Sequence, residues 1–316
     1  MTLENTAPGP HRPLSRREFL GLVLASGALA ALPSGLLAAA EDAAPPGPEL
    51  WVFHGPDPAR LMAACLKVID ANGGFGRNVR TLALKVNAAW AREPGQGANT
   101  HPALVEAFLA GCQAAGVGRV VLPENAASRG AQTFAMSGIA AAAEKYHAPM
   151  IDLQVNGKRF TRVTLPKGRR LQEAMVGTDF LEADAVVNLP VAKNHGASIV
   201  SAAMKNWMGA VQDRGVWHRN DLHQCIADFA SFLRPAWTII DAGHIIMDHG
   251  PQGPSKVMKH PNLLILSRDQ VAADAFAATL FVERPDSLGY LRLAAEMGLG
   301  TIDIAKMNIH RVEVTA

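Results

Sequence analysis

From Glu49 onward, short apolar runs alternate with longer segments of helical periodicity, and this alternation constrains the fold more than any other feature of the sequence. Such an order is typical of βα units arranged around a mainly parallel sheet. Several runs are apolar on both faces, as expected of strands covered by helices on each side. We therefore predict an α/β fold with a mainly parallel central sheet flanked by helices. The expected strands are Leu50–Phe53, Thr81–Val86, Arg119–Leu122, Met150–Leu153, Ala185–Leu189, Thr238–Asp241, Leu263–Leu266 and Ile309–Val314.

The longer segments between these runs are predicted to be helices. A further strand over Arg159–Leu165 would belong to a small hairpin or subdomain around residues 155–170. No obvious linker divides the chain after the N-terminal region, so we expect a single elaborated α/β domain. The expected helices are Pro58–Ala71, Pro102–Ala115, Ala131–His147, Gln172–Glu182, Ser198–Ala210, Asp221–Leu233, Gln270–Phe281 and Pro285–Met297.

The N-terminal region has the pattern of an export signal. Arg16 and Arg17 precede an apolar Gly/Ala/Leu stretch, which is the order of a basic region and a hydrophobic region in a twin-arginine signal peptide. We expect residues 1–40 to be the signal, 41–48 a Pro-rich leader and 49–316 the domain. The partner would be the twin-arginine export machinery, the contact with the membrane transient and the location periplasmic. A short membrane anchor that stays attached is the alternative.

Composition excludes several classes of protein. The 316 residues are 49% hydrophobic and 18% charged, which is a globular composition rather than a disordered one. A formal net charge of +2 gives no overall positive charge of the kind that binds nucleic acid. Any anion must therefore be bound by a local cluster of basic residues. The cysteines Cys65, Cys112 and Cys225 have neither C-x-x-C spacing nor the spacing of an iron–sulfur site. We expect no iron–sulfur cluster, and the sequence assigns no other cofactor.

Polar residues follow three of the predicted strands at their C-terminal ends. Lys85 and Asn87 end one strand, Lys193 and His195 follow a second, and Asp241 ends a third. In open parallel sheets, ligands bind in the crevice outside the carboxyl ends of the strands. These residues therefore predict a site, and the lysines predict that its ligand is an anion.

The segment before the predicted helix at Pro102 holds a further candidate. Thr100 can cap the helix through its hydroxyl group, and Pro102 suits the first turn. His101 is explained by neither role and would lie beside a helix N-terminus that also suits an anionic ligand. It can be a capping or solvated histidine, or a residue that binds the ligand.

Other candidates lie further along the chain. Lys205 and Asn206 fall on the helix predicted from Ser198, and Asp274 is an acidic residue inside an otherwise apolar helical stretch. His218 and His223 are five positions apart rather than the four that place two imidazoles on one helix face. Zinc hydrolysis is therefore not favoured. Candidate metal ligands are His218, His223 and Asp241.

Several of these stretches in their order resemble the family called domain of unknown function 362, in its branch with a twin-arginine signal. Some members of that family carry a ferredoxin-like module, which implies a redox role, but this chain lacks the cysteines of such a module. The stretches are Lys85-x-Asn87, Thr100-His101-Pro102, Leu189-Pro190-Val191-x-Lys193-x-His195, Met204-Lys205-Asn206-x-Met208-Gly209, Asp213-Arg214, His218-Arg219-x-Asp221-Leu222-His223, Ile226-Ala227-Asp228, Asp241, Gly250-Pro251-x-Gly253 and Val271-Ala272-x-Asp274.

Two classes of function remain open. The first is an exported enzyme acting on a small molecule that bears a carboxylate or phosphate. In this enzyme His195 would be general acid and base, the lysines Lys85, Lys193 and Lys205 an electrostatic clamp, and Asp241 would orient a histidine or lysine. The second is a periplasmic ligand-binding, metal-binding or redox-associated protein without turnover. In both classes the expected ligand-binding residues are Lys85, Asn87, His101, Asn206, His218 and Asp274.

Overall fold

Eight strands form one central sheet in the part of the chain that this computed structural model describes, residues 47–155 and 159–315. Each of the eight predicted strands is a member of this sheet, and the predicted α/β class is confirmed. The predicted signal peptide and most of the leader lie outside the described residues. In spatial order the strands are β14 (Asn308–Glu313), β1 (Glu49–His54), β13 (Leu263–Ser267), β10 (Trp237–Ala242), β7 (Ala185–Leu189), β2 (Thr81–Val86), β3 (Arg119–Glu124) and β4 (Met150–Asp152).

The sheet is mainly parallel. The run β10-β7-β2-β3-β4 is parallel throughout, and β14 is parallel to β1. Only β13, among the described strands of this sheet, is antiparallel to both of its neighbours. The carboxyl ends of β10, β7, β2 and β3 therefore meet along one edge of the sheet, where ligands bind in folds of this kind.

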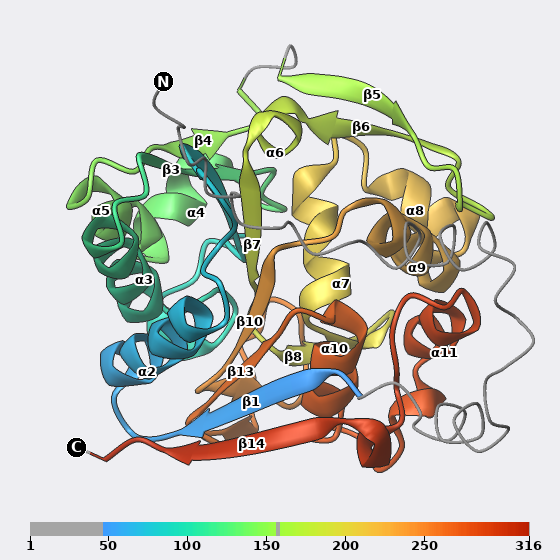
Figure 1. Cartoon of the computed structure of the whole chain (residues 1–316). Coiled ribbons are helices and arrows are strands. Elements are labelled where there is room, and N and C mark those ends of the chain that lie inside the picture. Colours follow the sequence, from blue (N-terminus) through green and yellow to red (C-terminus); the bar gives the residue numbers. More distant parts are fainter. Residues whose placement is uncertain (1–46, 156–158, 316) are drawn as a thin grey trace, which may run out of the picture. The chain divides into compact units, whose positions relative to one another are not determined.

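Helices cover both faces of the sheet, and each face has its own hydrophobic core (Figure 1). The apolar strands are thus buried on both sides, as their sequences predicted. One face carries α2 (Pro58–Ala71), α3 (Pro102–Ala114), α4 (Gly130–Met136) and α5 (Ile139–Glu144). The other face carries α6 (Thr178–Glu182), α7 (Ala203–Asn206), α8 (Gly215–Asn220), α9 (Leu222–Phe232), α10 (Gln270–Ala278) and α11 (Gly289–Glu296).

Acidic side chains fix the starts of three helices. Asp57 accepts hydrogen bonds from the backbone amides at the start of α2, Asp221 does so for α9, and Asp269 does so for α10. Each carboxylate accepts hydrogen bonds from amides that have no partner within the helix. Its negative charge also interacts favourably with the positive end of the helix dipole. These local signals explain why the helix starts at Pro58 and Gln270 were predicted correctly.

Two predicted helices begin instead as strands. Within Gln172–Glu182, residues Glu173–Gly177 form β6, which pairs with β5 (Phe160–Thr164). Within Ser198–Ala210, residues Ile199–Ser201 form β9, which pairs with β8 (Lys193–His195). Pairing across strands outweighs local helix propensity here. The predicted hairpin near residues 155–170 is confirmed as the pair β5 and β6.

A third predicted helix, Ala131–His147, is two helices. Gly138 lies between α4 and α5 with φ of 72°, a left-handed conformation that glycine adopts without steric cost. Short 3₁₀ turns complete the elements, together with a third hairpin. They are η2 (Pro94–Gln96), η3 (Trp207–Ala210), η4 (Pro285–Ser287), η5 (Ile304–Lys306), β11 (Ile245–Ile246) and β12 (Met258–Lys259). Among the described helices, none has both the length and the apolar character needed to cross a bilayer.

Candidate functional site

The polar side chains at the strand ends divide between the two faces of the sheet. The register pairs Lys85 with Asn188, and alternation along the strand places Lys85 on the face covered by α7. On β10, Ile240 packs into the core of that same face, whereas Ile239 packs into the opposite core. Asp241 therefore points to the face covered by α2 and α3. The predicted single crevice is in fact two groups of side chains on opposite faces of the sheet.

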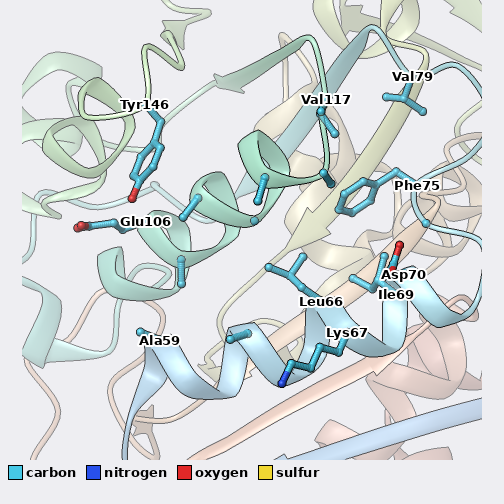
Figure 2. Close-up of a pocket in the computed structure, with 18 of the residues that line it drawn as sticks. Ala59, Leu66, Lys67, Ile69, Asp70, Phe75, Val79, Glu106, Val117 and Tyr146 are labelled. Atoms are coloured by element: carbon cyan, nitrogen blue, oxygen red, sulfur yellow. The ribbon is translucent and has the colours of Figure 1, made fainter.

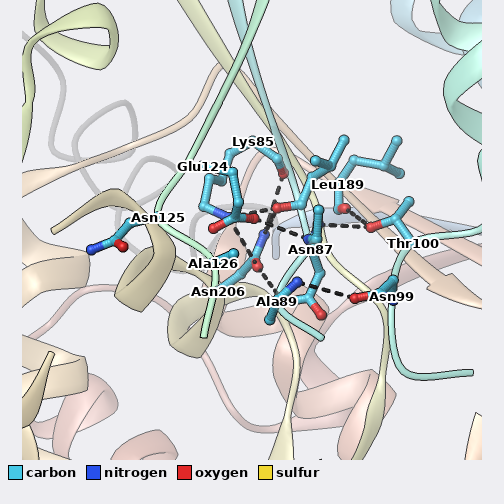
Figure 3. A network of polar contacts seen from close by, with 12 residues as sticks. Lys85, Asn87, Ala89, Asn99, Thr100, Glu124, Asn125, Ala126, Leu189 and Asn206 are labelled. Carbon is cyan, nitrogen blue, oxygen red and sulfur yellow. Dashed lines mark hydrogen bonds and ion pairs between the residues drawn. The ribbon is translucent and has the colours of Figure 1, made fainter. Parts of the chain in front are cut away.

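Lys85 and Glu124 form an ion pair inside the protein (Figure 3). The Lys85 Nζ donates to Glu124 Oε2 at 2.8 Å, to the Val86 carbonyl oxygen at 2.5 Å and to Asn206 Oδ1 at 3.3 Å. An ammonium group has three protons to donate, so these contacts use all of them. Burial lowers the pKa of Lys85, and the charge of Glu124 opposes that shift. The structure thus places Lys85 within a closed network, where it holds neighbouring groups rather than reaching a ligand.

Two asparagines connect this ion pair to Lys193. Asn206 Oδ1 accepts from Asn87 Nδ2 at 2.9 Å, and Asn206 Nδ2 donates to Asn188 Oδ1 at 2.8 Å. Asn87 Oδ1 in turn accepts from Lys193 Nζ at 2.6 Å. Because the amide groups of Asn87 and Asn206 already have protein partners, they orient charges rather than offer free contacts.

Lys193 lies at the end of this chain of hydrogen bonds. Its side chain is buried, and besides Asn87 its Nζ donates to the carbonyl oxygen of Ala98. Two of its three N–H groups are thus occupied among the described residues, and one remains. Burial, and next the charge of Lys205, lower the pKa of Lys193 to about 7, although Glu124 opposes the shift. This amine gains or loses its proton near neutral pH.

Lys205, on α7, is the least satisfied charge of the site. Its side chain is 7% exposed, and its Nζ contacts the Met208 sulfur at 3.3 Å. A thioether is a weak acceptor, and the ammonium has no oxygen acceptor among the described residues. Burial, and next the charge of Arg214, lower the pKa of Lys205 to about 8. A buried ammonium group without an oxygen acceptor is stabilised when an anion binds beside it.

Arg214 adds a further positive charge. Its Nη2 donates to the carbonyl oxygens of Asn125 at 2.7 Å and Ala126 at 2.8 Å, which fixes the guanidinium beside Glu124 and Lys205. Its Nε and Nη1 atoms have no hydrogen-bond partner among the described residues. Burial lowers the pKa of Arg214, which nevertheless stays protonated at any ordinary pH.

His195 and His218 complete the cationic group. His195 Nδ1 accepts from the Ala197 backbone amide at 3.0 Å, so in the neutral ring the proton is on Nε2. Burial, and next the charges of Lys205 and Lys193, lower the pKa of His195 to about 3. His218 is exposed, and burial and Lys205 lower its pKa as well. At neutral pH the His195 ring is therefore neutral as long as no anion is bound.

Asp241 and His101 lie together on the opposite face. Asp241 accepts from the backbone amides of His101 at 2.9 Å and Gly243 at 3.0 Å, and burial raises its pKa. It thus holds the loop before α3 at the backbone of His101, and no hydrogen bond connects it to Lys193, Lys205 or His195 among the described residues. The Nδ1 atoms of His244 and His260 lie 2.5 Å apart nearby. The adjoining cavity of about 20 Å³ has room for roughly one water molecule.

The cap of α3 is His101, one of the alternatives left open for this residue, and Thr100 has another role. The His101 Nδ1 accepts from the backbone amide of Ala103 at 3.3 Å. The Thr100 hydroxyl instead donates to the Leu189 carbonyl oxygen at 2.7 Å and accepts from the Asn87 amide at 2.8 Å. Thr100 therefore ties the ends of β2 and β7 together.

Asp274 is buried behind the cationic group, where it holds α7. Its carboxylate accepts from the backbone amides of Ala203 at 2.5 Å and Met204 at 2.9 Å. Since α7 carries Lys205 and Asn206, Asp274 fixes the positions of both residues through the helix backbone. The sequence instead predicts that Asp274 binds the ligand. Burial raises the pKa of Asp274 to about 7.

The candidate metal ligands do not come together. His223 stacks on Tyr290 between α9 and α11, with ring centroids 6.3 Å apart, whereas Asp241 is on the other face of the sheet. Within residues 47–155 and 159–315, no three His, Cys, Asp or Glu side chains are arranged to hold a metal ion. The cysteines are buried and separate, and burial raises the pKa of each.

A wide groove of about 1230 Å³ runs between α2 and α3 (Figure 2). Its lining is mostly apolar, with Lys67, Asp70, Glu106 and Tyr146 among the polar side chains. None of the predicted site residues lines it. The large volume of the groove therefore does not make it the site that the strand-end residues predict.

Three residues of the network were missing from the sequence predictions: Glu124, Asn188 and Arg214. Glu124 ends β3, so the rule that selected Lys85 and Asp241 selects it too. Asn188 is a polar residue inside an apolar strand, which is also a visible signal. Arg214 comes from a loop, and no periodicity places its side chain.

Comparison with known proteins gives one family and some distant relatives. Residues 82–279, more than half of the chain, match the family model described as "Domain of unknown function (DUF362)". The thylakoid-associated protein sll1697 of Synechocystis sp. (strain ATCC 27184 / PCC 6803 / Kazusa) is 23% identical over 252 residues, which are 76% of this chain and 75% of that protein.

Two solved structures share part of the fold. One is the lactate racemase apoprotein from Thermoanaerobacterium thermosaccharolyticum, with 14% identity and a TM-score of 0.39, covering 66% of this chain and 54% of that one. The other is a protein from Thermotoga maritima, with 9% identity and a TM-score of 0.46, covering 77% of this chain and 60% of that one. The chain thus spans less than two thirds of either solved protein.

Proposed function

The chain belongs to the domain of unknown function 362 family, and from its site we propose that it is an exported enzyme acting on an anionic small molecule. Lys193 and Lys205, supported by Arg214, bind the carboxylate or phosphate of that molecule. The observation that carries the proposal is the buried ammonium of Lys205, which has no oxygen acceptor among the described residues. An anion bound there supplies the missing acceptor and the missing charge.

Proton transfer is the second part of the proposal. Burial, and next the charges of Lys205 and Lys193 that attract the anion, hold the pKa of His195 at about 3 in the unliganded site. A bound anion offsets the charges of Lys193 and Lys205, so the pKa of His195 rises, although burial still holds it below its ordinary value. His195 is then a better general acid and base when substrate is present.

The rigid network behind the site supports an enzyme rather than a flexible binding surface. The pair of Lys85 and Glu124, with Asn87 and Asn206, fixes Lys193 without using its third N–H group. Groups whose pKa values are shifted toward neutrality and held by such a network are typical of catalytic sites. A protein that binds the same anions without turnover is the alternative.

Three variants separate these outcomes: Lys193→Met, His195→Gln and Lys67→Met, the last an exposed lysine on α2. Binding of inorganic phosphate and acetate is measured by calorimetry, and turnover is followed by NMR with a panel of phosphate esters and hydroxy acids. We expect Lys193→Met to weaken binding, His195→Gln to remove turnover while retaining binding, and Lys67→Met to do neither. No binding of any anion would overturn the proposal, and binding without turnover would support the alternative.

Export is the part of the proposal that rests on sequence alone. Arg16 and Arg17 followed by an apolar stretch support a twin-arginine signal. In a bacterial host, the full chain should reach the periplasm, and the variant Arg16→Lys/Arg17→Lys should stay in the cytoplasm. Equal export of both chains would contradict this route.

A further inference from the structure

The charge of the ligand can be inferred from the charges that the protein leaves uncompensated. This inference rests on the proposed anion site and specifies its ligand. We propose that the group bound beside Lys205 is a compact dianion, with a phosphoryl group as the best fit, rather than a single carboxylate.

The first argument is the number of free donors. Lys205 has three N–H groups and a thioether contact, Lys193 has one N–H group left, and Arg214 keeps those on Nε and Nη1. These are the donors without an oxygen partner among the described residues of the group. A carboxylate has two oxygens, whereas a phosphoryl group presents three and can accept from several cations at once.

The second argument is charge balance. Glu124 is paired with Lys85 at 2.8 Å, so the two cancel. Lys193, Lys205 and Arg214 then remain, and the pKa of each is lowered chiefly by burial. One carboxylate would leave an excess of buried positive charge. A dianion compensates more of that charge, at a depth where water screens little of it.

Among the described residues, the acids near Lys205 are already engaged by other groups. Its helix α7 is held by Asp274, whose carboxylate is occupied by the amides of Ala203 and Met204. Glu124 acts on Lys193 and Arg214 but is paired with Lys85. The other titratable groups that the pKa shifts connect to Lys205 are basic. They are Arg214 from the loop before α8, Lys193 and His195 from β8, His218 from α8 and His223 from α9.

Proton uptake on binding is the consequence that can be measured. The pKa of Lys193 is about 7 and that of Lys205 about 8, so at about pH 8 a fraction of both amines is neutral. A dianion raises both pKa values because it favours the charged amines. Binding therefore takes up protons from the buffer, and it takes up more for a dianion than for a monoanion.

The test is isothermal calorimetry on the full chain at about pH 8, in two buffers of different ionisation enthalpy. The titrants are inorganic phosphate, malonate and acetate, and the proteins are the wild type, Lys205→Met, Lys205→Gln and the surface control Lys67→Met. We expect phosphate to bind at least about tenfold more tightly than acetate, with measurable proton uptake. Lys205→Met and Lys205→Gln should each weaken phosphate binding at least about tenfold, whereas Lys67→Met should not.

Each outcome has one meaning. Tighter binding of malonate than of phosphate supports a dianion and identifies a dicarboxylate as its source. Equal binding of acetate and phosphate overturns the inference and leaves the proposed anion site intact. Phosphate binding that persists in both Lys205 variants overturns the inference by placing the anion elsewhere. Absence of binding by all three titrants overturns the proposed function itself. Melting curves of the two Lys205 variants verify that they fold.

Discussion

Lys85 and Glu124 form an ion pair in which the side chains are 0% and 1% exposed, with 2.8 Å between Nζ and Oε2. Such a pair is costly to break, because the remaining partner is left charged and buried. Glu124→Gln should therefore lower the free energy of unfolding by about 3–5 kcal/mol, as measured by urea denaturation.

A matched control comes from Lys145 and Glu106, which are also 2.8 Å apart but 59% and 38% exposed. Glu106→Gln should lower the free energy of unfolding far less than Glu124→Gln, since water screens the exposed pair and solvates either partner alone. Equal losses in Glu124→Gln and Glu106→Gln would contradict the internal position of the Lys85 pair.

A second prediction concerns the protonation of His195. Burial and the charges of Lys205 and Lys193 hold its pKa at about 3, so removal of one charge should raise it. In an NMR titration of the histidine ring signals, Lys205→Met should therefore show a higher pKa for His195 than the wild type. Lys67→Met should leave it unchanged, and a His195 pKa near 6.5 in the wild-type protein would rule out the close approach of these charges.

A third prediction concerns stability and pH. Burial raises the pKa of Asp274 from 3.8 to about 7, against the hydrogen bonds from Met204 and Ala203. Between about pH 4 and 7 the folded chain keeps a proton that the unfolded chain has lost. This group therefore makes the protein less stable as pH rises through that window, by at most about 1.4 kcal/mol per pH unit.

The variant Asp274→Asn has no carboxyl group at this position and so lacks this dependence of stability on pH. Urea denaturation from pH 4 to about pH 8 should show that the stability difference, wild type minus Asp274→Asn, falls as pH rises toward 7 and is then constant. Parallel curves across the whole range would show that Asp274 has an ordinary pKa and is not buried as described.

A fourth prediction follows from the division of the site between two faces. Asp241 holds the loop before α3 on the face opposite Lys205, through the amides of His101 and Gly243. Asp241→Asn should therefore change phosphate affinity by less than about twofold, although it lowers the melting temperature. A loss of phosphate affinity comparable to that of Lys205→Met, measured by the same calorimetry, would show that Asp241 is part of the anion site.

The sequence pattern predicts the sheet well because most of its strands are apolar runs with buried residues, although the edge strands β14 and β4 are not fully buried. It is weaker where tertiary pairing decides the structure: Glu173–Gly177 and Ile199–Ser201 join hairpins within segments that were predicted to be helical. The order of the strands in the sheet, and the face to which each side chain points, also decide which polar strand ends meet. A single sequence does not give either.

The same limit applies to the site. Lys85, Asn87, Lys193 and Asn206 meet because β2, β8 and α7 meet. Lys85, Asn87 and Lys193 are visible in the sequence because they lie at or after the ends of predicted strands, whereas Asn206 is a candidate on a predicted helix. Asp241 is at a strand end too, but alternation on β10 turns it to the other face. A rule based on strand ends identifies the edge of the sheet and leaves the face undetermined.

The anion site beside Lys205 can be observed directly in a crystal structure of the protein with arsenate, a phosphate analogue whose anomalous scattering identifies it. The account predicts an anomalous peak whose oxygens lie within hydrogen-bond distance of Lys205 Nζ, with further contacts to Lys193 or Arg214. A crystal in which Lys205 Nζ is bonded to a protein carboxylate, while the arsenate is absent or bound elsewhere, would contradict it.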